Sequence, residues 1–175
     1  VSASYVNVYN AVTGSSLYTL NNPDTIALGG LDNFGQTLAM NDTYLVVGAF
    51  AEEAQDGTSN NGIVYVYSTP TGDLLHTLTC PEPAVFGRYF GISIAVDGDY
   101  IAVADSRTIV YIYRASTGAS IRQFVDPVTV SSGFGASATF GQGVSIDGNY
   151  LFVGARNTHD PYQNGGRVYT FNITD

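Results

Sequence analysis

The sequence predicts an all-β fold built from repeated four-stranded antiparallel sheets, and three observations support this prediction. A unit that opens with Phe-Gly and places a Tyr ten residues later occurs at residues 34–49, 90–105 and 140–155. The Phe residues stand at positions 34, 90 and 140, so the units begin 56 and then 50 residues apart, a spacing typical of one blade of a repeat protein. No stretch shows a sustained helical period.

The first predicted strand of each unit has one face of small residues. In the first unit, Thr37 and Ala39 lie on one face, and Leu38 and Met40 lie on the other. Small residues recur at the equivalent positions of the later units, which are Ser93, Ala95, Gly143 and Ser145. This pattern suits a strand near a central axis, where neighbouring sheets converge.

The second and third predicted strands, residues 44–47 and 63–67 in the first unit, are apolar on both faces, as expected for a sheet between two others. The aromatic third strand recurs at residues 108–113 and 166–171. Between the first and second strands stand tight-turn residues that favour positive φ, which are Asp97-Gly98, Asp147-Gly148 and, in the first unit, Asn41-Asp42.

A fourth short strand is predicted after a Thr-Gly turn, at residues 74–78 and 120–124. The N-terminal residues repeat only the later parts of a unit, with strands at 5–9 and 17–20. We therefore expect one continuous arc over residues 1–175. Its parts are the last two strands of a blade (1–20), two full blades (34–78 and 90–124) and three strands of a last blade (140–171).

These motifs resemble the FG-GAP repeat of integrin-α-like β-propellers, in the variant found in secreted and surface proteins. The resemblance rests on the order Phe-Gly, small-apolar strand, Asp-Gly turn, Val-Gly-Ala and Gly-x-Val-Tyr-Val-Tyr, and it covers nearly all of residues 3–171. It implies a β-propeller of four-stranded antiparallel blades, with about three and a half blades in this chain. It also implies an extracellular or cell-surface protein of adhesion or recognition.

The chain departs from that family pattern in two places. The second unit has Ala104-Asp105 where the family has Gly-Ala, and the Asp-rich calcium loop of integrin blades is absent from every unit. We therefore expect no cofactor and no tightly bound metal.

The predicted strands leave both ends of the arc open. They number about thirteen, close to half of a ring of roughly seven blades. Both ends supply the aromatic third strand, so the chain cannot close on itself by completing a shared blade. Open apolar faces and strand edges favour association. We expect assembly edges at residues 5–9 and 168–171, namely Tyr5, Val6, Val8, Tyr9, Val168, Tyr169 and Phe171, covered by other copies or by further blades of a longer chain.

Composition excludes some partners. The net charge is −9, the estimated pI is 4.3, and no lysine occurs, so the chain lacks the basic stripe of a nucleic-acid-binding protein. No apolar run is long enough for membrane insertion. The first residue is Val rather than Met, which suggests processing or a fragment. Cys80 is the only cysteine and can form no internal disulfide.

Two Asn-x-Thr sequons are candidate glycosylation sites, at Asn41 and Asn172. About one or two such sequons arise by chance in a chain of this length. Asn41 falls at the tip of a predicted hairpin, where a glycan would leave the packing intact, whereas Asn172 ends a strand.

Candidate catalytic groups are sparse. His76 lies four residues before Cys80, but an isolated pair at a strand end is more often structural than catalytic. The segment 133–138 resembles a dinucleotide loop, yet no helix follows it. Asp97 and Asp99 flank a glycine in a predicted turn, where turn formation explains them better than metal binding or acid–base chemistry. We therefore expect no enzymatic activity.

Variation concentrates in the loops between the second and third strands, where binding residues are often found. The first such loop, 50–61, is acidic and could hold a weakly bound cation, or form only a solvated turn. The last, 156–165, mixes charged and aromatic residues that could contact a partner protein or a sugar. The candidate partner or ligand residues in the two loops are Glu52, Glu53, Asp56, Arg156, His159, Asp160 and Tyr162.

Three classes of function follow. A structural or adhesive extracellular module that acts through protein–protein contacts, with self-assembly into a ring or filament, agrees best with the resemblance and the open ends. A propeller that binds carbohydrates or other ligands through the two long loops is the alternative. An enzyme would need convergent titratable groups, which the sequence does not offer.

Overall fold

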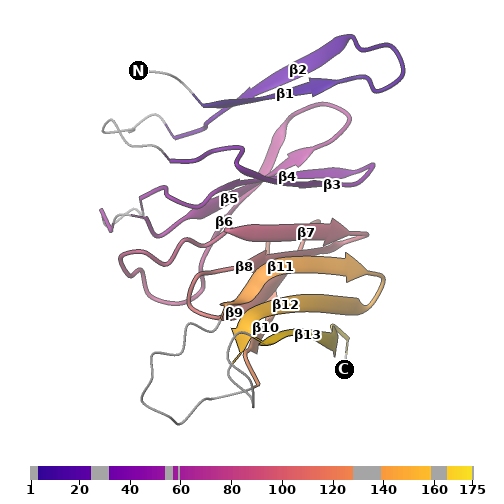
Figure 1. The fold of residues 1–175 in the computed structure, drawn as a ribbon. Coiled ribbons are helices and arrows are strands. Elements are labelled where there is room, and N and C mark those ends of the chain that lie inside the picture. Colours follow the sequence, from indigo (N-terminus) through magenta and orange to yellow (C-terminus); the bar gives the residue numbers. More distant parts are fainter. Residues whose placement is uncertain are drawn as a thin grey trace.

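The computed structural model describes residues 4–24, 32–53, 57–58, 60–127, 139–158 and 165–174. These residues form thirteen β-strands in four separate antiparallel sheets that are stacked one on the next, with the two chain termini at opposite ends of the stack (Figure 1). None of the described residues belongs to a helix long and apolar enough to cross a membrane.

Each sheet contains strands that are consecutive in the chain. The N-terminal sheet consists of β1 (Tyr5–Tyr9) and β2 (Ser16–Asn21). The first blade consists of β3 (Thr37–Met40), β4 (Tyr44–Ala49), β5 (Ile63–Ser68) and β6 (Leu74–Thr79). The second blade consists of β7 (Ser93–Asp97), β8 (Tyr100–Ala104), β9 (Ile109–Arg114) and β10 (Ser120–Val125). The third blade has three strands, β11 (Thr139–Asp147), β12 (Tyr150–Thr158) and β13 (Gly165–Asn172).

This topology confirms the predicted all-β propeller class. In both complete blades the strand order in the sheet equals the order in the chain, so each sheet is a meander of hairpins. The stack is open, because the N-terminal sheet and the third blade lie at its two ends and do not meet (Figure 1).

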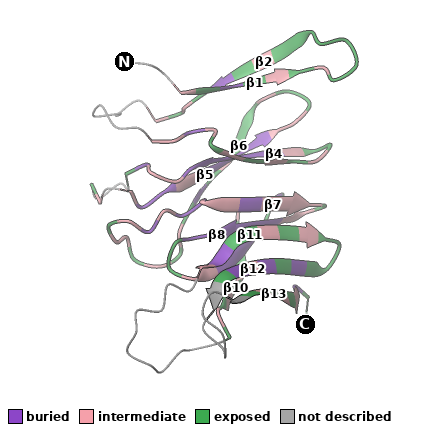
Figure 2. Cartoon of the chain, in the orientation of Figure 1, coloured by how far each residue is buried: buried purple, intermediate pink, exposed green. Residues whose placement is uncertain are grey.

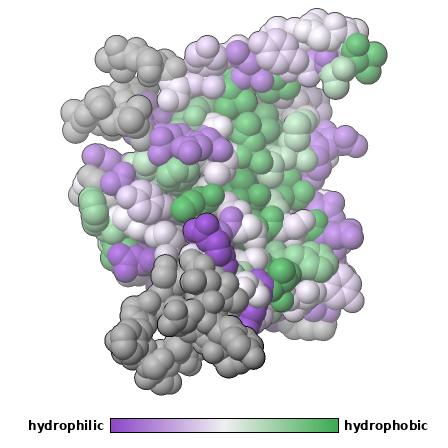
Figure 3. All heavy atoms as spheres, viewed as in Figure 1, coloured by the Kyte–Doolittle hydropathy of each residue, from purple (hydrophilic) through white to green (hydrophobic). Residues whose placement is uncertain are grey.

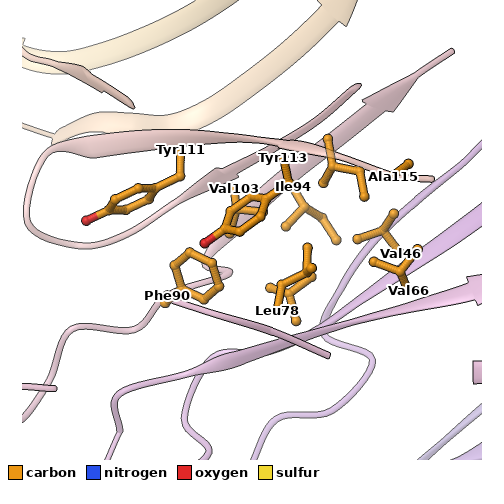
Figure 4. Packing of buried hydrophobic residues seen from close by; sticks show 11 residues of the cluster. Val46, Val66, Leu78, Phe90, Ile94, Val103, Tyr111, Tyr113 and Ala115 are labelled. Atoms are coloured by element: carbon orange, nitrogen blue, oxygen red, sulfur yellow. The ribbon is translucent and has the colours of Figure 1, made fainter. Parts of the chain in front are cut away.

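The core consists of three apolar clusters, one in each interface between neighbouring sheets. The largest joins the first and second blades: Val46, Val66 and Leu78 face Phe90 and the aromatic rings of β9 (Figure 4). Burial colouring shows the buried positions at the middle strands of the blades and the exposed ones at both ends of the stack (Figure 2). Strands β4 and β5 are buried on both faces, as expected for a sheet between two others.

The predicted small-residue face of the first strand lies against the following blade. The Thr37 hydroxyl donates a hydrogen bond of 2.7 Å to the Gly91 carbonyl oxygen, and Ala39 packs on the cluster between the first two blades. In the second blade, Ser93 takes the equivalent place and accepts a hydrogen bond from the Val144 amide at 3.3 Å. Small residues therefore allow adjacent inner strands to approach each other.

The turn between the first two strands differs in the first blade from the prediction. Gly98 and Gly148 have positive φ of 51° and 55°, as predicted. Neither Asn41 nor Asp42 has positive φ. Instead, the Asn41 side-chain oxygen accepts hydrogen bonds from the amides of Thr43 and Tyr44, at 2.9 and 2.8 Å, and this Asx turn shapes the hairpin without left-handed backbone.

Candidate functional site

The closed interfaces show how one blade recognises the next. The glycine of each Phe-Gly unit has positive φ and lies against a valine of the preceding sheet, so close that a side chain there would need the valine to move. A methyl group added to the glycine would lie 2.7 to 3.3 Å from Cγ2 of that valine. The pairs are Gly35 with Val6 (2.7 Å), Gly91 with Val64 (2.7 Å) and Gly141 with Val110 (3.3 Å).

The phenylalanine of each unit packs on the aromatic third strand of its own blade. All three phenylalanines are buried, and each ring meets a tyrosine ring at a centroid distance of 5.7 or 5.8 Å. The pairs are Phe34–Tyr65, Phe90–Tyr111 and Phe140–Tyr169. This confirms that the three Phe-Gly units occupy equivalent positions.

At the start of the stack, the outer side of the N-terminal sheet forms the N-terminal open face. Tyr5, Tyr9 and Leu17 are 60%, 57% and 56% exposed there. Asn7 and Thr19 lie between them and join through a side-chain hydrogen bond of 2.8 Å. The face is thus mainly aromatic and aliphatic, with one polar pair at its centre.

Two apolar side chains of the first blade are also uncovered. Leu38 and Met40 are 50% and 58% exposed on the side of β3 that faces the N-terminal sheet. Their equivalents in β7, Ile94 and Val96, pack against the first blade. Hydrophobic residues gather on this side of the molecule around β3, below the two-stranded sheet (Figure 3). The reason is that the N-terminal sheet has outer strands only, without the inner pair that would cover β3.

At the other end, the outer side of the third blade forms the C-terminal open face, with Phe152, Gly154, Val168 and Thr170. Strand register aligns these residues with Val46, Gly48, Val64 and Val66 of the first blade. The three valines of the first blade are fully buried, whereas Val168 is 71% exposed, Phe152 is 38% exposed and Thr170 is exposed. Within the part of the chain that the structure describes, the third blade therefore presents an interface surface that no other sheet covers.

The predicted assembly edges divide between these faces and the core. Tyr5, Tyr9 and Val168 point outward, as expected of contact residues. The side chains of Val6 and Val8 instead pack into the cluster below the N-terminal sheet, and Tyr169 and Phe171 pack against the cluster above the third blade. Because side chains alternate along a strand, only half of each predicted edge can face outward.

A cavity of about 450 Å³ opens on the C-terminal open face. Its lining includes Gly143, Gly154, Arg156, Gly166 and Val168. Arg156 is exposed at the end of β12, so the predicted loop residue lies at the cavity. The other predicted residues of that loop, His159, Asp160 and Tyr162, lie outside the described residues.

The acidic loop of the first blade contains a buried carboxyl. Glu52 is 1% exposed, and its Oε1 accepts a hydrogen bond from the Tyr65 hydroxyl at 2.5 Å, while Oε2 has no hydrogen-bond partner among the described residues. Burial, opposed by the Tyr65 hydrogen bond and reinforced by the charges of Asp24 and Asp32, raises the pKa of Glu52 to about 7. The prediction of a solvated turn is therefore wrong for Glu52, which is buried.

The same loop contains two further predicted ligand residues. Glu53 is exposed, and Asp56 lies outside the described residues. No group of three or more histidine, cysteine or acidic side chains with metal-binding geometry occurs among the described residues.

The second blade also buries a carboxylate beside the equivalent tyrosine, but this carboxylate is paired with a cation. Asp105 is 1% exposed, accepts a hydrogen bond from Arg88 at 3.0 Å, and also accepts backbone hydrogen bonds from Arg107 and Ile109 at 2.9 and 3.0 Å. Arg88 also donates to the Tyr111 hydroxyl at 3.3 Å. Sequence reasoning missed this network, although the departure at Ala104-Asp105 was its signal: a buried Asp in place of Ala needs a positive partner.

The asparagine side chains of the two sequons make different hydrogen bonds. The side-chain nitrogen of Asn41, the atom that a glycan would occupy, donates a hydrogen bond of 3.1 Å to the Gly98 carbonyl oxygen in the next blade. A glycan at Asn41 would therefore alter a contact between blades, contrary to the expectation that packing would stay intact. The side-chain oxygen of Asn172 accepts hydrogen bonds from the amide and hydroxyl of Thr174.

The weak catalytic candidates have structural surroundings. Burial raises the pKa of the Cys80 thiol, which disfavours a thiolate. Asp97 accepts a hydrogen bond of 2.7 Å from the Gly148 amide, and Asp99 accepts hydrogen bonds from the amide and hydroxyl of Ser116, at 2.7 and 2.8 Å. Both carboxylates thus fix turns. The segment 133–138 lies outside the described residues.

The stacked four-stranded meanders and their repeated Phe-Gly contacts define this chain as part of a β-propeller. The FG-GAP repeat family matches it at residues 29–67 and 130–171. Two segments of the chain therefore match the FG-GAP repeat, as its motifs predict. The second blade lies outside both matched ranges, and it is the blade that carries Ala104-Asp105.

No curated protein matches the chain. Among solved structures, BamB from Moraxella catarrhalis matches with a TM-score of 0.49 and 14% identity, over 85% of this chain and 34% of that one. The computationally designed Ika8 protein matches with a TM-score of 0.48 and 15% identity, over 80% of this chain and 33% of that one. The chain thus spans about a third of the length of either protein.

Proposed function

We propose that this chain is a non-enzymatic extracellular structural or adhesion module that works through protein–protein contacts at its two open faces. Its partners are further copies of itself, which would give a ring or a filament, or further blades. The observation that carries this proposal is the C-terminal open face, where Val168 is 71% exposed although its equivalents Val64 and Val110 are fully buried.

The energetics favour covering both faces. Burial of apolar surface contributes roughly 25 cal/mol per Å², so a face built like a blade interface favours association by several kcal/mol. The N-terminal and C-terminal open faces differ in composition, so a contact between them is head-to-tail. Such contacts generate a ring if the rotation closes and a filament if it does not.

The extracellular setting is supported by the repeat family and the composition. FG-GAP repeats are typical of extracellular or surface proteins. A net charge of −9 without lysine fits neither a nucleic-acid partner nor an anionic membrane surface.

Sedimentation velocity of the intact chain tests the proposal. We expect concentration-dependent assemblies in the wild type, and we expect Val168→Asp to shift them toward monomer, because it buries a charge in any contact at the C-terminal open face. Val12→Asp is the matched control, since Val12 is 95% exposed in the turn between β1 and β2, outside the C-terminal open face. A monodisperse wild-type monomer at micromolar concentration would contradict self-assembly.

A ligand-binding propeller is the second candidate, and it is favoured by the position of Arg156 in the lining of the cavity. On this alternative the loops 50–61 and 156–165 contact a glycan or another surface ligand. A glycan-array signal that is lost in Arg156→Ala and retained in Val12→Asp would support it.

A further inference from the structure

The interface between the first and second blades shows what fills the inner part of a blade face. Phe90-Gly91 crosses the face of the first blade over two glycines. A methyl group on Gly62 would lie 2.2 Å from the Phe90 oxygen, and one on Gly48 would lie 2.9 Å from the Gly91 oxygen. The Phe90 amide donates a hydrogen bond of 2.9 Å to the Asn61 oxygen. At this interface the two glycines therefore leave room for the Phe-Gly backbone.

The same arrangement recurs between the second and third blades with slightly larger residues. A methyl group on Gly141 would lie 2.9 Å from the Ala104 Cβ and 3.3 Å from the Val110 Cγ2. Ala104 takes the place of Gly48, and Val110 takes the place of Val64. Across the stack, a small residue on the second strand and a valine on the third receive each incoming Phe-Gly.

The third blade repeats these receiving residues, but no other described residue fills them. Gly143 and Gly154 are paired in the sheet as Thr37 and Gly48 are, and Gly154 is paired with Val168 as Gly48 is with Val64. Gly166 aligns with Gly62 in the sequence, although only Gly62 has positive φ. Among the described residues, methyl groups on Gly154 and Gly166 would meet no atom nearer than 3.5 and 3.9 Å, and one on Gly143 would meet none within 4 Å. These residues, the cradle, line the cavity of about 450 Å³.

We propose that the cradle of Gly143, Gly154, Gly166 and Val168 binds the Phe-Gly dipeptide of a β-hairpin formed by the first two strands of another FG-GAP unit. This inference rests on the proposed function, since it names the chemistry of the contact at the C-terminal open face. The cradle selects for glycine because its valine occupies the space of a side chain, as Val64 does for Gly91.

The hairpin must come from outside the three units described above. Phe34, Phe90 and Phe140 are 5%, 0% and 2% exposed, so each is already used within its own stack. The N-terminal sheet lacks the same element: β1 and β2 are the outer strands of a blade, and Leu38 and Met40 lie exposed where an inner pair would pack. A Phe-Gly-led hairpin that pairs with β1 would therefore complete the blade and carry the dipeptide that the cradle receives.

A peptide-binding experiment on the intact chain tests this inference. The probe is a fluorescent synthetic peptide of residues 88–104, which contains Phe90-Gly91 and both inner strands of the second blade, and binding is followed by fluorescence anisotropy. We expect saturable binding. A peptide with Gly91→Ala should bind about 5- to 150-fold more weakly, because overpacking in a fitted site costs about 1–3 kcal/mol.

The matched protein variants are Gly166→Val, which fills the cradle, and Val12→Asp, which should leave binding unchanged. Circular dichroism and the melting temperature establish that Gly166→Val is folded, and Val168→Asp provides a second block if it is not. Absence of binding, equal binding of the Gly91→Ala peptide, or full binding to both cradle variants would overturn the inference. Self-association that persists in Gly166→Val would leave the proposed function standing without the cradle.

Discussion

The face of the first blade and the C-terminal open face are built from equivalent residues, yet one is closed and the other is open. Val64 and Val168 hold the same place on the third strand, and their exposed fractions are 0% and 71%. Gly62 and Gly166 likewise correspond, but only Gly62 meets an incoming Phe-Gly. The difference shows that burial in this fold is decided by the neighbouring sheet and not by the strand itself.

The largest expected effect comes from placing a charge at the two valines. Val64→Asp should destabilise the chain by about 4 kcal/mol or prevent folding, because it buries an unpaired carboxylate. Val168→Asp should change the free energy of unfolding of the monomer by less than about 0.5 kcal/mol. Urea denaturation at low protein concentration measures both, and equal losses would show that the C-terminal open face is covered within the monomer.

The two glycines give the next largest contrast. Gly62 has a φ of +88° and no room for a methyl group, so Gly62→Ala should cost about 3 kcal/mol from backbone strain and overpacking. Gly166→Ala meets neither obstacle and should change stability by no more than about 0.5 kcal/mol. Thermal unfolding compares the pair. A large loss in Gly166→Ala would mean that its surroundings are as crowded as those of Gly62.

The buried carboxyls of the first and second blades, Glu52 and Asp105, also lie in different surroundings, because of the two only Asp105 has a cation beside it. The pKa of Glu52 in the folded chain is about 7, above its ordinary value of 4.5. The folded state therefore binds more protons between these pH values, and its stability falls as the pH rises through them. Between about pH 5 and pH 8 the loss should reach about 2 kcal/mol, and Glu52→Gln should remove most of this slope.

Denaturant titrations across this pH range provide the measurement. Glu53→Gln is the neighbouring control, because Glu53 is exposed, and it should retain the wild-type slope. A slope unchanged in Glu52→Gln would assign the pH dependence to other groups.

The smallest expected effect concerns the turn contact between blades. Asn41→Asp keeps the side-chain oxygen that caps the hairpin but removes the donor to Gly98, so it should cost about 1 kcal/mol. Thermal unfolding compares it with Asn172→Asp. If glycosylation of Asn41 leaves the melting temperature of the protein unchanged, the contact with Gly98 contributes nothing.

Much of the fold follows from local patterns. The period of the Phe-Gly units, the apolar second and third strands and the Asp-Gly turns each depend on residues close together in the chain, and the structure confirms them. The direction of the β1 side chains could not be predicted from the sequence, because alternation alone does not say which face meets the next sheet. The Arg88–Asp105–Tyr111 network also escaped prediction, since its residues come from separate segments that only the folded blade brings together.

The acidic loop of the first blade illustrates a second limit of prediction from sequence. The acidic run at Glu52 reads as a solvated surface, yet one of its carboxyls is buried beneath Tyr65. Tyr65, which donates a hydrogen bond to this carboxyl, lies thirteen residues further along the chain. Exposure of a charged residue therefore depended on a contact that composition does not reveal.

The most direct test of the central claim, that the open faces are sites of association, is hydrogen exchange measured at several protein concentrations. Strands β5 and β13 are equivalent, but β5 is paired on both sides and β13 on one. We expect β13 and β1 to exchange faster than β5 in dilute protein and to gain protection as concentration rises, while β5 stays unchanged. Exchange of β13 and β1 that is independent of concentration throughout the micromolar range would contradict the account.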